Sequence, residues 1–239
     1  MNSFLDQSNR TRRNVIVAAV VLVLLVGAGL GWFLTRPGST RDTVEPPTPT
    51  KQPSATPVQT PTGPMKRIKG ERTVEGISVG YPHSTAGAVS AAAEYMAQIG
   101  STLDPERAKT IARVVADPSF AGAVDYFAKG PVNTRTSLGL PAEGPLPAGA
   151  SVVLGPAAYQ LRNLAEDSAV VLLLGFHTAS TPDGGVKPKV GVYPLEMHWD
   201  GSDWKILQPK IALQNDYSSL AAQPGTSEAA AKGWLELSP

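Results

Sequence analysis

Residues 169–174 read Ala-Val-Val-Leu-Leu-Leu and are followed, after Gly175, by Phe176. A continuous apolar run of this length is typical of the central strand of a sheet. Upstream, Tyr159 and Leu161 alternate with polar residues, which predicts a neighbouring strand. The fold is therefore expected to be organised around a sheet in which residues 169–174 form the central strand.

The segment after residue 189 predicts a further strand with a change of side-chain parity. Its apolar residues fall into two sets, Val190 and Val192 in the first and Leu195, Met197 and Trp199 in the second. Since alternate residues of a strand point to opposite faces, only one set would reach the core. A β-bulge at Tyr193-Pro194 would return both sets to the core face, and we expect one there.

The sequence Trp199-Asp200-Gly201-Ser202-Asp203-Trp204 predicts a hairpin turn, because Asp-Gly between two strand residues is a strong turn signal. Ile206 continues the returning strand. Together these patterns predict three or four antiparallel strands in the second half of the chain.

The chain before these strands predicts three helices. Ser84 is the expected N-cap of the first, whose apolar residues recur at helical spacing until Gly100. Asp104-Pro105-Glu106 supplies a cap, a proline and an acid in the order that begins a second helix. Asp117-Pro118 repeats the start signal for a third helix, which Gly130-Pro131 is expected to end.

The prolines within residues 130–149 predict a connecting loop, and residues 227–237 predict a weak terminal helix. Helices followed by antiparallel strands indicate an α+β fold, with the helices packed on one face of a curved sheet.

Residues 14–34 contain no charged side chain and would span roughly 31 Å as a helix, close to the thickness of the hydrocarbon core of a bilayer. A cleaved signal peptide is the alternative, but its apolar region is shorter. The arginines before this stretch favour a cytoplasmic tail at residues 1–13. We therefore expect a single-pass protein of the cell membrane that contacts lipid through residues 14–34 and carries its C-terminal domain outside the cell.

Residues 35–64 contain 8 Pro and 8 Thr among 30 residues, a composition that predicts a disordered stalk. Residues 65–239 are then expected to fold as an extracytoplasmic domain. This part contains 15 basic and 17 acidic side chains, a net charge of −2. A proline-rich ligand for a partner protein is the alternative interpretation of the stalk.

The composition excludes several classes of site. The chain has no Cys, which rules out disulfides, thiolate metal sites and cysteine nucleophiles. The net charge of the whole chain is +1, so no direct binding of nucleic acid is expected. One basic run opens the folded domain, comprising Lys66, Arg67, Lys69 and Arg72. We expect a solvated entry segment there, with contact to an anionic polymer, a lipid or DNA as the alternative.

Residue patterns give little evidence of catalysis. The stretch Gly76-Ile77-Ser78-Val79-Gly80 matches the G-x-S-x-G pattern, but it lacks the parallel-sheet context of a nucleophile elbow. His83 precedes a helix start and is expected to lie in a capping turn. His198 shares a strand face with Glu196 and Asp200, so a metal or acid–base pair is the alternative to a polar solvent face. No catalytic, cofactor-binding or metal-binding residue is assigned, and no cofactor is expected.

The order of helices and strands, the long central strand and the hairpin of Trp199, Asp200, Gly201, Asp203 and Trp204 resemble nuclear transport factor 2-like domains. With the N-terminal anchor and stalk, the chain is similar to the inner-membrane scaffold protein of type IV secretion systems and to conjugation proteins of Gram-positive plasmids. Residues 79–89 also resemble actinobacterial membrane proteins found with mobile elements. This resemblance covers most of residues 75–210.

The resemblance implies a cone-shaped space between sheet and helices, which in some relatives is an enzyme pocket. Such a pocket needs a titratable side chain directed into it. Tyr159 and His177 are the weak candidates for that role. The resemblance favours a noncatalytic protein that scaffolds an envelope assembly for conjugative DNA transfer or secretion, with protein partners and homo-oligomers. The alternative is a membrane-tethered domain that binds a ligand or acts as an enzyme.

Overall fold

The computed structural model of the protein describes residues 60–239. The tail expected at residues 1–13, the anchor at residues 14–34 and most of the stalk at residues 35–64 lie outside the described residues. Within residues 60–239, no helix combines the length and the apolar composition needed to cross a bilayer.

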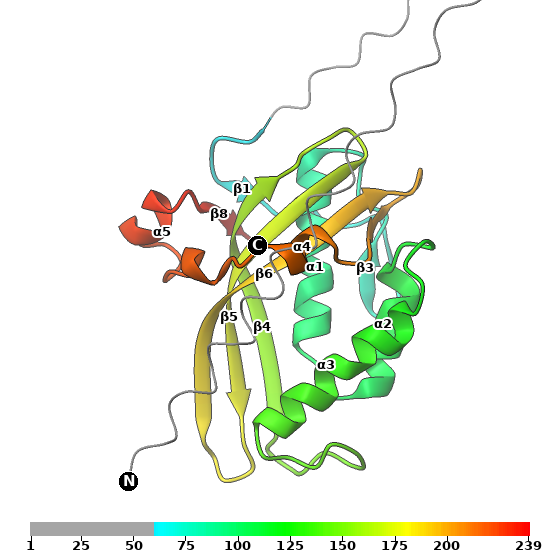
Figure 1. The fold of residues 1–239 in the computed structure, drawn as a ribbon, viewed down its shortest axis with the longest axis vertical. Coiled ribbons are helices and arrows are strands. Elements are labelled where there is room, and N and C mark those ends of the chain that lie inside the picture. The colour runs from blue at the N-terminus through cyan, green and yellow to red at the C-terminus, as the bar shows by residue number, and fades with distance from the viewer. Residues whose placement is uncertain (1–59) are drawn as a thin grey trace, which may run out of the picture. The chain divides into compact units, whose positions relative to one another are not determined.

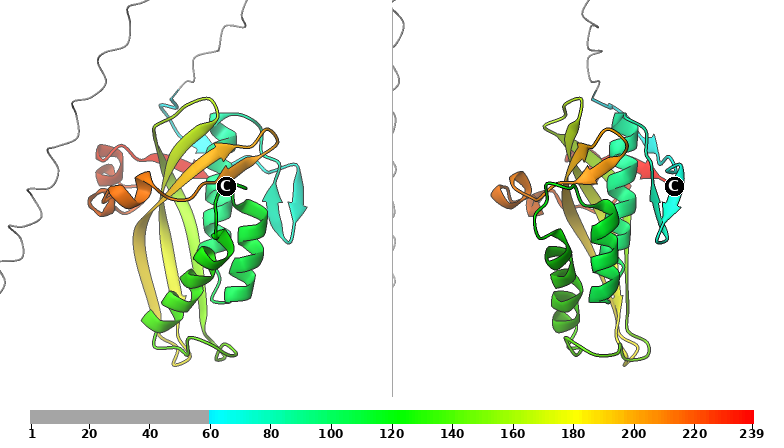
Figure 2. Two further views of the ribbon diagram at one scale, coloured as in Figure 1. Left: turned by 45° about the vertical axis from the view of Figure 1, so that its right-hand side comes forward. Right: turned by 90° about the vertical axis from the view of Figure 1, so that its right-hand side faces the viewer.

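Six strands form the main sheet, in the order β1-β8-β4-β5-β6-β7 (Figure 1). They are β1 (Met65–Lys66), β4 (Ser151–Arg162), β5 (Ser168–Ser180), β6 (Val186–Trp199), β7 (Trp204–Ile206) and β8 (Leu235–Ser238). All neighbouring strands are antiparallel except β1 and β8. A separate hairpin consists of β2 (Arg72–Val74) and β3 (Ile77–Val79), and Figure 2 shows it standing apart from the main sheet.

The helices of the first half are α1 (Thr85–Gly100), α2 (Pro105–Val115) and α3 (Ala123–Ser137). In Figure 1 they lie to the right of the strands, whereas the short C-terminal helix α5 (Ser227–Ala231) lies to their left. The α+β fold with helices on one face of a curled sheet is thereby confirmed. The sheet has more strands than predicted because both ends of the domain contribute a short one.

β5 is the central strand, as predicted, and residues 169–174 are buried on both of its faces. Val171 and Leu173 belong to the large core beneath the helices. Leu172 and Leu174 belong to a smaller core on the opposite face, beneath the C-terminal segment. The run of residues 169–174 is continuously apolar because it supplies two cores at once.

The β-bulge predicted at Tyr193-Pro194 is wrong, because β5 and β6 keep one register along the whole of both strands. Val192 packs against the smaller core, whereas Leu195 belongs to the larger one. The change of apolar parity therefore reflects burial on two faces. A register shift is present instead between β4 and β5.

The predicted starts of the first two helices are confirmed. Ser84 caps α1, with its hydroxyl accepting from the backbone N–H of Gly87 at 3.0 Å. Asp104 caps α2 by accepting from the N–H of Glu106 at 2.9 Å, with Pro105 as the first helical residue. Each cap satisfies a backbone donor that has no partner within its helix.

The third helix differs from its prediction at both ends. The Asp117 carboxylate accepts from the N–H of Ser119 at 2.8 Å, which holds a turn, and α3 begins only at Ala123. It then continues through Pro131 to Ser137, so the loop predicted for residues 130–149 starts about two turns later. Gly130 permits this continuation, since a residue without Cβ avoids the clash that disfavours helical geometry before proline.

The terminal helix predicted for residues 227–237 is wrong beyond its first turns. The helix α5 ends at Ala231, and Gly233 adopts a positive φ of 83° that stops it. Trp234 then inserts into the smaller core, and β8 pairs with β4. Burial of a large aromatic side chain outweighs the helical tendency of the alanines that precede it.

The space between the helices and the sheet is filled by side chains. The largest fully buried side chains there are Trp204, Tyr95, Tyr159, Ile77, Ile111, Leu173 and Met197. The described domain is therefore held by dense packing of its apolar side chains.

Candidate functional site

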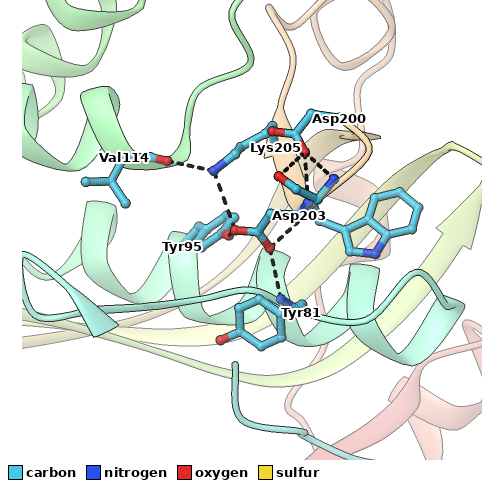
Figure 3. Close-up of polar contacts among 8 residues, drawn as sticks. Tyr81, Tyr95, Val114, Asp200, Asp203 and Lys205 are labelled. Carbon is cyan, nitrogen blue, oxygen red and sulfur yellow. Dashed lines mark hydrogen bonds and ion pairs between the residues drawn. The ribbon is translucent and has the colours of Figure 1, made fainter. Parts of the chain in front are cut away.

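The most connected polar group in the described domain is the buried carboxylate of Asp203, in the hairpin between β6 and β7 (Figure 3). Its Oδ1 accepts from the backbone N–H groups of Tyr81 at 3.0 Å and Trp204 at 2.9 Å. Its Oδ2 accepts from the Tyr95 hydroxyl at 3.2 Å. One carboxylate thus joins the hairpin to helix α1 and to the segment that precedes it.

Lys205 balances the charge of Asp203. Its Nζ lies 3.5 Å from Asp203 Oδ2 and donates to the backbone carbonyl of Val114 at 3.0 Å (Figure 3). A buried charge needs a charged partner and hydrogen bonds to offset its desolvation, and Asp203 has both. The pair also ties β7 to the end of α2.

The two tyrosines beside Asp203 are held in their neutral form. Burial raises the pKa of Tyr81 to about 12, with smaller contributions that include the charges of Glu94 and Asp203. Burial and the nearby Asp203 carboxylate also raise the pKa of Tyr95. Both phenols therefore stay protonated near neutral pH, and the hydrogen bonds of the group join three segments of the domain.

The other members of the predicted hairpin complete this group. Trp199 and Trp204 face each other across the strand pair. Asp200 accepts from the N–H groups of Ser202 and Asp203, both at 2.8 Å. Burial alone raises the pKa of Asp200, but these hydrogen bonds outweigh it and leave the pKa below its ordinary value. Gly201, between the two acids, adopts a positive φ of 95°.

His83 has a wider role than the predicted capping turn, in which Ser84 is the cap. The His83 ring stacks on Trp199 with centroids 4.6 Å apart. Its Nε2 lies 2.9 Å from Asp167 Oδ1 and 3.0 Å from the carbonyl oxygen of Glu166. His83 therefore connects the start of α1 with the turn between β4 and β5 and with the end of β6.

The three residues of the predicted metal or acid–base group at His198 do not act together. Glu196 accepts from the backbone N–H groups of residues 210 and 212. His198 Nδ1 lies 2.8 Å from Asp117 Oδ2, and Asp200 caps the hairpin. Among residues 60–239, no set of three His, Asp or Glu side chains is placed to hold a metal ion.

Asp117 was not singled out by the sequence, apart from its expected role at a helix start. Burial by itself raises the pKa of this carboxyl group, but hydrogen bonds from Ser119 and His198 outweigh that effect and lower the pKa below its ordinary value. The Asp117 backbone N–H also donates to the carbonyl of Ile206 at 2.9 Å. The link therefore holds the α2–α3 connection against the edge strand β7.

Tyr159 and His177 do not meet in a common pocket. Tyr159 is fully buried, and its hydroxyl donates to the backbone carbonyl of Gly63 at 3.0 Å. His177 lies further along the sheet, opposite Leu154 and Lys189. Burial and the Lys189 charge lower the pKa of His177. His177 lies within β5, which continues to Ser180.

Two surface hollows stand out in the described domain, and neither contains Tyr159 or His177. One, of about 520 Å³, lies between α2, α3 and the loop after α3. Arg135 in its wall is already bound to the backbone carbonyls of residues 103, 141 and 144. The other, of about 420 Å³, lies beside the β2–β3 hairpin and includes Ser78. Ser78 sits in the middle of β3, not in the sharp turn that a nucleophile elbow requires.

An uncharged face of the sheet is exposed at the far end of β4, β5 and β6. In Figure 1 these strands extend below α5, which leaves that face without a covering helix. Nine cross-strand neighbours share it, namely Ser151, Val153 and Gly155 in β4, Phe176, Thr178 and Ser180 in β5, and Val186, Pro188 and Val190 in β6. Val190, at the end of this set nearest the C-terminal segment, also packs against the smaller core. The exposed fractions of Val153, Phe176 and Val186 are 59%, 39% and 61%. We call these nine residues the open sheet face.

Sequence reasoning missed both the Asp203 network and the open sheet face. The acid in the hairpin reads as an ordinary turn residue, and nothing near it in sequence marks a partner 122 residues away. The open sheet face could not be recognised because its residues continue the strand pattern of the buried part of the same strands. The sequence of β6 did contain a signal for this face, because Val186 and Val190 lie at alternate positions with Val192 and therefore on the same side of the strand.

Comparison with known proteins gives one family and no characterised relative. A family model described as a domain of unknown function (DUF8175) matches residues 45–228. No curated protein and no solved structure matches the chain.

Proposed function

The chain belongs to the DUF8175 family of domains of unknown function, and we propose that it is a noncatalytic membrane-anchored protein whose outer domain binds other proteins of an envelope assembly. The open sheet face carries this proposal. Exposed apolar surface without charged residues is typical of protein interaction sites.

The packing of the domain supports an interaction role over catalysis. The space between the sheet and the helices is filled, and the buried acid Asp203 is fully engaged in hydrogen bonds. A nuclear transport factor 2-like fold is part of the proposal, supported by helices on one face of a curled sheet. By this resemblance, the assembly serves conjugative DNA transfer or secretion.

The location of the protein is proposed from sequence alone. Residues 14–34 anchor the chain in the cell membrane, residues 1–13 stay in the cytoplasm, and the domain lies outside. The Pro/Thr-rich residues 35–64 set the distance over which the domain reaches its partners.

The partner binds the open sheet face itself and does not pair with the outer edge of β6. The long outer edge of β6 carries Pro188 and Pro194, together with Lys187 and Lys189. Proline lacks the N–H that strand pairing needs, and lysine on an edge opposes pairing with another chain.

Site-specific photocrosslinking in native membranes tests this proposal. A photoreactive amino acid replaces Thr178, at the centre of the open sheet face, or Lys109, a partly exposed residue of α2, in the full chain. We expect crosslinks to secretion or conjugation components from position 178 and not from position 109. Phe176→Asp and Val153→Asp should abolish them by placing charge on the face. Equal crosslinking from both positions, or crosslinks unaffected by the two substitutions, would refute the proposal. Crosslinks only between copies of this chain would show a homo-oligomer interface instead.

A further inference from the structure

The hollow beside the β2–β3 hairpin is lined by the half-buried Arg67, whose guanidinium has one buried atom without a partner. The Nε atom of Arg67 is shielded from solvent and has no hydrogen-bond acceptor, the one buried side-chain donor or acceptor in residues 60–239 left in this state. Leaving a buried charged donor without an acceptor costs more than leaving a neutral one, and natural structures rarely tolerate it. The missing acceptor is a feature of the site that requires an explanation.

The backbone holds Arg67 and its neighbours in a fixed position. The N–H of Arg67 donates to the carbonyl of Ser238 at 2.9 Å. The N–H of Ile68 donates to the buried hydroxyl of Ser90 at 3.1 Å, and the N–H of Gly70 donates to Ser78 Oγ at 3.0 Å. The segment is thus tied to β8, α1 and β3, so the side chain of Arg67 starts from a preorganised backbone.

The charges around the hollow fall into two groups. Arg67 and Lys69 line it, and neither forms an ion pair within residues 60–239. The positive charge of Arg67 lowers the pKa of Tyr81, but burial is the larger effect and raises that pKa to about 12. Glu94 is the acidic side chain in the same wall, which Pro239 also lines. The contacts of Glu94 with the Ser78 N–H at 3.4 Å and with Gln98 Nε2 at 3.0 Å both use Oε1.

We propose that this hollow binds a phosphorylated polyol, with the phosphate at Arg67 and Lys69 and a hydroxyl of the polyol at Glu94. Arginine offers planar donors that match the oxygens of a phosphate, and Lys69 adds a second positive charge. Glu94 opposes a bare anion but accepts a hydrogen bond from a hydroxyl, so the ligand carries both groups. The hollow of about 420 Å³ is within the range of small-ligand sites. This site is separate from the open sheet face and does not depend on the proposed scaffold function.

Calorimetric titration of the full chain in detergent tests the site, with glycerol 3-phosphate, inorganic phosphate and glycerol as probes at constant ionic strength. We expect glycerol 3-phosphate to bind at least tenfold more tightly than inorganic phosphate, and glycerol alone not to bind. Arg67→Met should weaken glycerol 3-phosphate binding at least tenfold. Glu94→Gln should remove most of the preference for glycerol 3-phosphate over inorganic phosphate. Arg113→Met, which changes an exposed arginine of α2 outside the hollow, should leave binding unchanged.

Lys69→Met keeps the test decisive if Arg67→Met does not fold, because Lys69 is exposed and its loss should still weaken binding several-fold. No binding of glycerol 3-phosphate by the unchanged protein, or equal binding by Arg113→Met and the two hollow variants, overturns the proposal. Dihexanoyl phosphatidylglycerol below its micelle concentration distinguishes the source of the ligand. Tighter binding than glycerol 3-phosphate assigns the site to a lipid headgroup, and weaker binding assigns it to a soluble phosphate ester.

Discussion

Asp203 accepts a hydrogen bond from the backbone N–H of Tyr81, 3.0 Å away in space and 122 residues away in sequence. The contact closes the helical half of the domain onto the last hairpin of the sheet. Because the same carboxylate also binds Tyr95 and lies beside Lys205, its loss disturbs the helices and the sheet together. The network is the feature on which the stability of the domain should depend most strongly among its polar groups.

Asp203→Ala should destabilise the domain by about 3–5 kcal/mol, because it leaves Lys205 unpaired and the buried donors of Tyr81 and Tyr95 without an acceptor. Urea unfolding of the full chain, followed by circular dichroism, measures the change. Asp125→Ala, at an exposed aspartate of α3, is the control. It should lower the free energy of unfolding by less than about 1 kcal/mol, as is typical of surface substitutions. A similar loss in both variants would contradict the role given to Asp203.

Gly87→Ala should destabilise the domain even though alanine is the better helix former by about 1 kcal/mol. A Cβ at this position of α1 would lie 2.0 Å from the carbonyl oxygen of Pro82. That carbonyl accepts the indole N–H of Trp204 at 3.0 Å, so any shift of the backbone also breaks this hydrogen bond.

The midpoint of thermal unfolding measures the effect of Gly87→Ala. Gly155→Ala is the matched control, since a Cβ there meets nothing within 4 Å. We expect a clear fall in Tm for the first variant and little change for the second. An unchanged or raised Tm for Gly87→Ala would show that the approach of Pro82 is not a constraint.

His177→Leu should make the stability of the domain less sensitive to pH. Burial and the Lys189 charge lower the pKa of His177 in the folded state, so the unfolded chain binds its proton more readily. Stability from this residue is therefore complete above the ordinary pKa of about 6.5 and falls as the pH drops through the folded-state value. Unfolding free energies measured at pH 7.5 and pH 5.5 should differ less in the variant than in the unchanged protein. His198→Leu serves as a comparison, and a larger flattening there would contradict the assignment.

Asp117→Asn should destabilise the domain at neutral pH by about 1–3 kcal/mol, because it weakens hydrogen bonds from His198 and Ser119 to a buried acceptor. The pKa of Asp117 is lowered in the folded state, so its contribution is complete above the ordinary value and disappears as the pH falls through the folded-state value. The variant should thus converge with the unchanged protein in strong acid. Stability measured from pH 7 to pH 2.5 checks this, and a constant difference across that range would contradict it.

The elements that could be predicted are those whose signals are local. The side chains of Ser84 and Asp104 accept from backbone N–H groups within three residues, so a short stretch of sequence is enough to predict these caps. The central strand at residues 169–174 and the hairpin at Trp199 are equally local, because apolar runs and Asp-Gly turns act within a few residues.

The errors occurred where a distant contact overrode the local signal. Asp117 resembles a helix cap, but its backbone is paired with Ile206 and its side chain with His198, so α3 starts later. The alanines after residue 227 favour a helix, yet burial of Trp234 against β5 turns the chain into a strand of the sheet. In both cases the tertiary partner supplies more free energy than the propensity of the segment.

The sequence by itself determined the α+β class, the central strand and the charge-free stretch at residues 14–34, because periodicity and composition act along the chain. Only the tertiary structure decided that the sheet has a core on each face, that the lower part of one face stays open, and that Arg67 lies beside a surface hollow. These features depend on which residues meet across long separations in sequence. A pattern of apolar residues indicates that a strand face is suited to burial. Which part of that face is covered depends on where the C-terminal segment lies on the folded sheet.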